Sequence, residues 1–125
     1  MTAVVLDTGA LVGFERNDRS VVAIVVRALE HHDPLLVTAG VVAQAWRDGS
    51  RQARLARLLG SPLCEVLDLD DRQARAAGQL CGLAATTDVV DASVAVAARD
   101  RGARVITSDP DDLRHLDHRI DVVAI

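Results

Sequence analysis

Three aspartates are the residues of this sequence best suited to chemistry, because each is attached to an otherwise apolar segment. Asp7 and Asp109 each follow a short, mostly apolar run, and Asp91 interrupts the alanine- and valine-rich segment 89–98. Burying a lone carboxylate costs several kcal/mol unless it is paired, protonated or bound to a metal. Convergent carboxylates favour hard divalent cations. The three acids therefore predict an oxygen-lined site for Mg²⁺ or Mn²⁺.

A simpler role is open to most of these acids, because Asp is a favoured residue at helix N-termini. Asp7 and Asp109 each stand just before an expected helix and can cap it. Asp88 is better explained as a helix N-cap than as a ligand, although it remains a candidate fourth metal ligand. Asp91 has the weakest alternative, since Thr87 or Asp88 offers the cap of its helix. The metal hypothesis therefore depends on Asp7, Asp91 and Asp109 occurring together, and not on any one of them alone.

The elements that must position these acids follow from the hydrophobic pattern. Short apolar runs alternate with helical patterns, which predicts repeated βα units around a mostly parallel sheet in one domain spanning residues 1–125. The expected strands are 3–7, 35–37, 64–69, 103–107 and 120–125. Four of the expected helices span residues 8–16, 39–48, 49–59 and 110–116. A fifth begins after an N-cap at Ser20 and runs to residue 32, and a sixth begins after an N-cap at Asp70 or Asp71 and runs to residue 83. The last spans residues 89–101 and ends at Gly102.

This order of elements predicts where the acids meet. Ligands of open parallel sheets bind outside the carboxyl ends of the strands. Asp7 and Asp109 occupy that end of their expected strands. Asp91 lies in the first turn of the helix that leads into the Asp109 strand, which can place it beside Asp109. A cation held there polarises a phosphate and lowers the pKa of a water molecule.

The composition excludes several other functions. All fourteen basic residues are Arg, and the absence of Lys excludes P-loop nucleotide hydrolysis, Schiff-base chemistry and phospho-acceptor receiver domains. The net charge of −4 does not indicate nucleic-acid binding by itself. No apolar run reaches membrane-spanning length and no signal peptide is recognisable, so we expect a cytoplasmic protein without membrane contact.

The potential soft metal ligands do not form a motif. Cys64 and Cys81 are far apart and make no CxxC, so we interpret them as two buried thiols in a reducing compartment. His115 and His118 lie on a short polar segment without a third soft ligand nearby. A surface pair explains these histidines better than a zinc site does.

Three segments together resemble the PIN-domain ribonucleases, with the greatest similarity to the VapC-type toxins of bacterial toxin–antitoxin pairs. These segments are Leu6-Asp7-Thr8, the Asp91-Ala92 start of an alanine-rich helix, and the stretch from Val105 to Leu113. Asp91 and Asp109 are eighteen residues apart, as expected for the third and fourth acids of that family. The resemblance covers the whole chain.

The resemblance implies a three-layer α/β/α domain with the activity of a Mg²⁺- or Mn²⁺-dependent endoribonuclease. Asp7, Asp91 and Asp109 would be its catalytic, metal-ligating acids, and RNA phosphodiester bonds its substrate. The family also implies a homodimer that is inhibited by a cognate antitoxin protein.

One position departs from the family pattern. The family usually supplies a Glu from the helix after its second strand, and here Gln44 stands at that place. An amide oxygen can still bind a metal or its water, but it brings no charge, so metal binding should be weaker. Glu15 is too far along its helix to replace the missing acid directly, and Asp88 is the better candidate. The alternative is therefore a degenerate PIN domain that acts as a binding or regulatory module.

Two surfaces are candidates for partners. Arg47, Arg51, Arg54 and Arg57 fall in one short stretch and can contact RNA phosphates, although an ordinary solvated helix face explains each residue taken alone slightly better. The valine-rich helix starting near Ser20 can offer a groove for the antitoxin or a homodimer face, and core packing explains it as well. A phosphatase of the haloacid-dehalogenase type is disfavoured, because Gly9 replaces its second Asp and Lys is missing.

Overall fold

The central layer of the protein is a five-stranded sheet in which every neighbouring pair of strands runs parallel. The computed structural model describes residues 2–125, and the strand order is β3-β2-β1-β4-β5. The predicted mostly parallel α/β fold is thus confirmed. The strands are β1 (Val4–Leu6), β2 (Leu35–Thr38), β3 (Cys64–Leu67), β4 (Arg104–Thr107) and β5 (Val122–Ala124).

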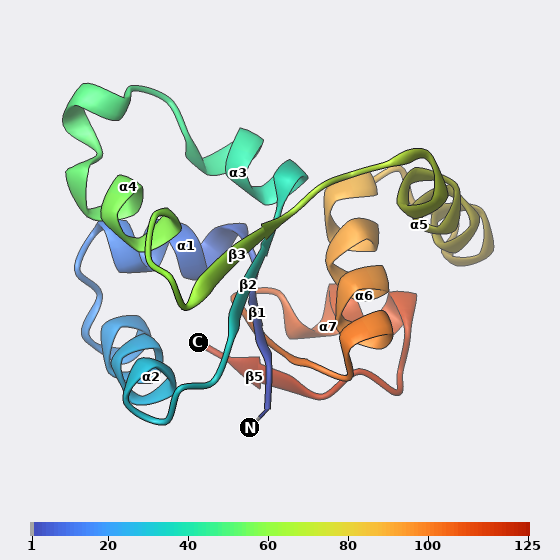
Figure 1. The fold of residues 1–125 in the computed structure, drawn as a ribbon. Coiled ribbons are helices and arrows are strands. Elements are labelled where there is room, and N and C mark those ends of the chain that lie inside the picture. The colour runs from blue at the N-terminus through green and yellow to red at the C-terminus, as the bar shows by residue number, and fades with distance from the viewer. Residues whose placement is uncertain (1) are drawn as a thin grey trace.

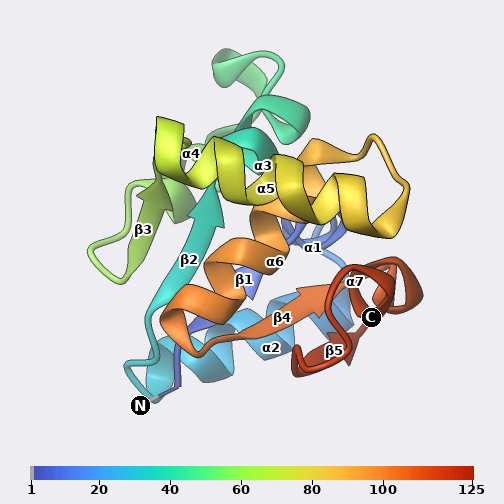
Figure 2. The same cartoon turned by 90° about the vertical axis from the view of Figure 1, so that its right-hand side faces the viewer.

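Helices cover both faces of the sheet, which gives the three expected layers (Figure 1). One face carries α1, α2 and α4, and the other carries α5, α6 and α7, with α5 lying across α6 (Figure 2). The helices are α1 (Thr8–Glu15), α2 (Arg19–Glu30), α3 (Ala39–Ala45), the 3₁₀ turn η1 (Gly49–Arg51), α4 (Ala53–Leu59), α5 (Asp71–Ala84), α6 (Val89–Arg101) and α7 (Pro110–Leu116).

Aspartate side chains start most of these helices by accepting hydrogen bonds from otherwise unpaired N–H groups. Asp70 accepts from the backbone of Gln73 at 2.8 Å, which settles the choice left open between Asp70 and Asp71. The expectation for α2 was wrong. Its cap is Asp18, which accepts from the N–H groups of Ser20 and Val21, so Ser20 lies inside the first turn.

The helix expected over residues 39–48 ends early, at Ala45. The buried side chain of Gln52 forms hydrogen bonds with the backbone groups that would otherwise continue the helix. Its Oε1 accepts from the N–H groups of Arg47 and Asp48, at 2.8 and 3.0 Å. Its Nε2 donates to the carbonyl of Ala45 at 2.9 Å and to the carboxylate of Glu15. This single amide therefore fixes the connection between α3 and α4.

Aliphatic side chains form the core between the layers, as the scarcity of aromatic residues requires. The central strands β1 and β2 are buried along their whole length, and α6 is buried from Ala92 to Ala98. A helix this apolar on all sides belongs inside the protein. A second, smaller cluster joins α5 to α6 around Ala77 and Cys81. Asp91 therefore lies in the first turn of the most deeply buried helix.

Within residues 2–125, no helix taken alone has the length and apolar character needed to cross a membrane. Helices α5 and α6 meet those two criteria only when they are counted together as a pair bent by 112°.

Candidate functional site

The parallel pairing of β1 with β4 brings Asp7 and Asp109 to one edge of the sheet. Leu6 is in register with Ile106, and the N–H of Asp7 donates to the carbonyl of Ile106 at 3.1 Å. The fully buried Thr107 connects the two acids, because its hydroxyl accepts from the N–H of Asp109 at 2.8 Å and hydrogen-bonds to the carboxyl of Asp7. The carboxyl ends of β1 and β4 therefore form the floor of the site.

Asp7 caps α1, which is one of the two roles that its sequence position suggested, and it lies where the other role would place it. It caps α1 by accepting from the N–H of Ala10 at 2.8 Å, and its side chain is buried at the edge of the sheet. Burial raises the pKa of this carboxyl, and the charge of Asp109 raises it further. Hydrogen bonds from Thr107, Ala10 and Ser108 act in the opposite direction without cancelling the effect of burial.

Asp91 faces the same edge from α6, which runs down from the carboxyl ends of the strands (Figure 1). Burial, together with the neighbouring carboxylates of Asp88, Asp7 and Asp112, raises its pKa from 3.8 to about 7. Asp88 caps α6 by accepting from the N–H of Asp91 at 3.0 Å, so the capping interpretation of Asp88 is confirmed. Asp7 therefore connects Asp91 on one side with Asp109 on the other.

Asp109 stands at the N-cap position of α7, but its carboxylate does not cap the helix. The capping alternative for its side chain is thus wrong. The residue is exposed, and its carboxylate accepts a hydrogen bond from the Ser108 hydroxyl at 3.4 Å. This carboxylate consequently remains accessible to a ligand.

The donor chemistry of this cluster suits a hard divalent cation, because its members are carboxylates and two of them have a raised pKa. The cost of burying these carboxylates, and the smaller repulsion between them, would both be relieved by a cation lying between the acids. Within residues 2–125, no three His, Cys, Asp or Glu side chains stand close enough in this conformation to hold one metal ion.

Gln44, the residue at the altered acid position, lies beside the cluster. Its Oε1 accepts a hydrogen bond from the hydroxyl of Thr8, which directly follows Asp7. Glu15, by contrast, is held by the amide of Gln52 through both carboxylate oxygens at 3.1 Å. Glu15 is therefore committed to the α3–α4 connection.

The four arginines proposed for RNA contact do not all face the same surroundings. Arg54 stacks on the ring of Phe14, 5.0 Å from its centroid, and lines a hollow of about 270 Å³ together with Arg57. Arg47 donates to the backbone carbonyls of Ala43 and Trp46, and Arg51 lies 3.7 Å from the carboxylate of Asp48. Arg54 and Arg57 share one surface, whereas Arg47 and Arg51 are engaged locally.

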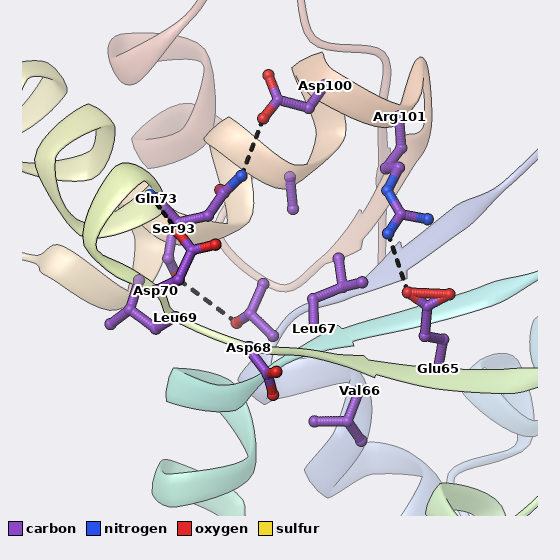
Figure 3. Close-up of a pocket in the computed structure, with 12 residues that line it drawn as sticks. Glu65, Val66, Leu67, Asp68, Leu69, Asp70, Gln73, Ser93, Asp100 and Arg101 are labelled. Atoms are coloured by element: carbon purple, nitrogen blue, oxygen red, sulfur yellow. Dashed lines mark hydrogen bonds and ion pairs between the residues drawn. The ribbon is translucent and has the colours of Figure 1, made fainter.

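A hollow of about 300 Å³ opens between β3 and the helices α5 and α6 (Figure 3). The polar groups of its wall are largely satisfied by one another. The guanidinium of Arg101 lies 2.9 Å from the carboxylate of Glu65, and Gln73 donates to Asp100 at 3.1 Å. These pairs leave few free groups to recognise a ligand, so we assign no function to this hollow.

Three residues of the site had no role in the sequence interpretation. Thr8 and Thr107 follow or end apolar strands, and a hydroxyl next to a strand-end acid was a usable signal for both. Asp112 is exposed in the first turn of α7, yet its charge contributes to the raised pKa of Asp91. Its position, one helical turn after Asp109, was the available signal.

The thiols and imidazoles lie outside this cluster. Cys64 and Cys81 are both free, and Cys81 is buried whereas Cys64 is half-buried. Burial raises the pKa of the Cys64 thiol to about 11. His115 is exposed and forms a hydrogen bond of 2.9 Å between its Nε2 and the carbonyl of Ala84.

Gly9 allows the start of α1 to approach the end of β4, and a larger residue should disrupt the site. A Cβ at this position would lie 2.1 Å from the Oγ and 2.8 Å from the Cβ of Ser108. We expect Gly9→Ala to lower the free energy of unfolding by about 1–3 kcal/mol, as overpacking commonly does. Urea denaturation followed by circular dichroism measures this change.

The Gly9 prediction has an internal control. In the double variant Gly9→Ala/Ser108→Gly, both clashing atoms of the serine side chain are removed, so most of the lost stability should return. Equal destabilisation of the single and double variants would show that the contact with Ser108 is not the cause.

Comparison with known proteins identifies the family of this chain. The model of the PIN domain family matches residues 4–119, which is nearly the whole sequence. The chain belongs to the PIN-domain family. This PIN domain gives no significant match among curated protein sequences.

Solved structures resemble this PIN domain in fold at low sequence identity. VapBC2 from Rickettsia felis, bound to a DNA fragment from its promoter, has a TM-score of 0.73 at 13% identity and covers 99% of each chain. FitAB bound to an IR36 DNA fragment has a TM-score of 0.70 at 19% identity, covering 97% of this chain and 94% of the other. FitAcB from Neisseria gonorrhoeae has a TM-score of 0.67 at 20% identity and covers 95% of each chain.

Proposed function

We propose that this PIN domain is a divalent-metal-dependent endoribonuclease and the toxin of a toxin–antitoxin pair. The observation that carries the proposal is the position and charge of Asp7 and Asp91. Both are placed at the carboxyl edge of the sheet, and burial together with neighbouring carboxylates raises the pKa of both. Perturbed acids at a ligand-binding edge are typical of functional sites.

Asp7, Asp91 and Asp109 would hold Mg²⁺ or Mn²⁺. When bound, such an ion polarises a phosphodiester and makes a water molecule a stronger nucleophile at neutral pH. Asp7 is fixed by its capping bond and by Thr107, so its carboxyl has a defined orientation. In the metal-free protein, burial and neighbouring carboxylates raise the pKa of Asp91 to about 7, so a bound cation would have to displace its proton. Asp88 offers its second oxygen, since one oxygen caps α6.

The partners are inferred from the family resemblance together with the surface. Arg54 and Arg57 flank an apolar hollow formed with Phe14, Leu29 and Leu58, which suits an amphipathic segment of a cognate antitoxin. The similarity in fold to VapBC2 and FitAB supports a toxin–antitoxin assignment. We further infer a homodimer in the cytoplasm, in which Arg47 and Arg51 would exchange their local partners for RNA phosphates.

The direct test is cleavage of a labelled RNA in Mg²⁺ or Mn²⁺. We expect cleavage by the wild type and a loss of at least about 100-fold in Asp7→Asn and Asp91→Asn, because a neutral amide is a poor ligand for a hard cation. Asn can still cap α1 through its side-chain oxygen, so Asp7→Asn should remain folded. EDTA should abolish the wild-type activity.

Asp68→Asn is the matched control, because this exposed carboxylate lies on the loop after β3. It should cleave RNA like the wild type. If the folded Asp7 and Asp91 variants cleaved RNA at the wild-type rate, the nuclease proposal would be wrong.

The alternative function is that of a degenerate PIN domain with weak or no nuclease activity, acting as a binding or regulatory module. Gln44 favours it, since the position carries no charge and its carbonyl oxygen is occupied by Thr8. Gln44→Glu separates the two functions. A change from no cleavage to measurable cleavage would support the degenerate function, whereas activity already present in the wild type would support the enzyme.

A further inference from the structure

The two polar atoms of the Gln44 amide differ in their hydrogen bonding to the described residues, because the oxygen has a partner and the nitrogen has none. Helix α3 places its side chain against the first residue of α1, where the hydroxyl of Thr8 donates to its Oε1. Thr8 directly follows the buried acid Asp7. The side chain of Gln44 is otherwise exposed, and within residues 2–125 its Nε2 has no hydrogen-bond partner. The free group of this amide, on a side chain anchored next to Asp7, is thus a pair of N–H donors.

A pair of free N–H donors is complementary to a hydrogen-bond acceptor such as a phosphate oxygen. An amide N–H₂ donates hydrogen bonds and cannot accept them, so it suits a phosphate oxygen and does not suit a cation. The carboxylates of Asp7 and Asp91, which lie at the same end of the sheet, repel a phosphodiester when they are ionised. A neutral donor at position 44 attracts the phosphate without adding to that repulsion.

We propose that Gln44 binds a non-bridging phosphate oxygen of the RNA substrate through its Nε2, with Thr8 as the residue that orients the amide. Gln44 is then a substrate-binding residue and not a metal ligand. This inference rests on the proposed ribonuclease function, and it assigns the residue at the altered acid position a role of its own.

RNA binding in the absence of metal tests the proposal without relying on cleavage. Fluorescence anisotropy of a labelled single-stranded RNA, measured in EDTA, should show about 10-fold weaker binding for Gln44→Ala, as for loss of a hydrogen bond to a charged group. Gln44→Glu should weaken binding further, because its carboxylate repels the phosphate. Gln79→Ala, which removes an exposed glutamine of α5, should bind like the wild type.

Thr8→Val tests the orienting role, because it removes the hydroxyl and keeps the shape of the side chain. With the hydroxyl gone, the amide of Gln44 can rotate freely, so RNA binding should weaken about 3-fold and the Gln44→Ala effect should shrink in the double variant. Additive losses in the double variant would overturn the role of Thr8.

Titration with Mn²⁺ separates the phosphate contact from metal ligation. If Nε2 faces the phosphate, Gln44→Ala should leave the Mn²⁺ affinity within about twofold of the wild type by calorimetry, since a true ligand contributes far more. Weaker Mn²⁺ binding with unchanged RNA binding would overturn the proposal and make Oε1 a ligand.

The remaining outcomes distinguish this inference from the function on which it rests. A wild type that binds and cleaves RNA, together with Gln44→Ala binding RNA equally well, would refute the inference alone. A wild type that neither binds nor cleaves RNA would refute both.

Discussion

Asp91→Asn is expected to make the metal-free protein more stable at pH 8 while it destroys the proposed site. The pKa of Asp91 is raised from 3.8 to about 7 in the folded protein, so the fold retains a proton that the unfolded chain releases. Stability is therefore lost as the pH rises from about 4 to about 7 and stays low above that. Because Asp91 is half-buried, solvent screening reduces the effect, and we expect the free energy of unfolding of the variant at pH 8 to exceed that of the wild type by about 1–2 kcal/mol.

Thermal unfolding in EDTA from pH 4 to pH 8 measures this effect. The melting temperature of Asp91→Asn should equal that of the wild type near pH 4 and exceed it by about 4–8 °C at pH 8. Asp68→Asn, which alters an exposed acid, should follow the wild type throughout. A pH-independent difference between Asp91→Asn and the wild type would show that ionisation of Asp91 does not destabilise the folded protein.

Mn²⁺ is expected to reverse this order of stabilities. A cation that binds only the folded state stabilises it by about 2.7 kcal/mol at 100 times its dissociation constant, or about 10 °C in melting temperature for a domain of this size. Protons compete for Asp91 below pH 7, so the shift should be larger at pH 8 than at pH 5.5. Differential scanning fluorimetry with and without Mn²⁺ measures both effects.

The variants of the acids test where the ion binds. Asp7→Asn, Asp91→Asn and Asp109→Asn should each lose most of the Mn²⁺-induced shift, and Asp68→Asn should keep it. With saturating Mn²⁺ at pH 8, the wild type should therefore be more stable than Asp91→Asn, the reverse of the order in EDTA. A full Mn²⁺ shift in all three acid variants would place the ion elsewhere on the protein.

Much of the fold could be predicted from the sequence, because local patterns determine where strands and helices form. The bounds of α6 and α7 agree with expectation, since α6 has a strong cap at Asp88 and a positive-φ glycine at Gly102, and Pro110 begins α7. The bounds of α2 and α3 were less accurate. Asp18 competes with Ser20 as a cap, and Gln52 ends α3 from seven residues away along the chain.

The candidate site could be predicted in part. A carboxylate at the end of a buried strand, or in the first turn of an otherwise apolar helix, is visible in the sequence, so Asp7, Asp91 and Asp109 could all be identified. The roles of these acids were less visible, because a cap and a ligand use the same side chain. Asp7 caps α1 and also faces the cluster, whereas Asp109 occupies a cap position without capping.

The sequence by itself determined the α/β class, the family resemblance and the three candidate acids, because all of these depend on residue type and spacing along the chain. Only the tertiary structure decided which groups modify them: Thr107 between Asp7 and Asp109, Asp112 near Asp91, and Thr8 on the amide of Gln44. The reason is physical. A pKa and a hydrogen bond depend on distances between side chains from separate elements, and those distances arise only when the helices pack on the sheet.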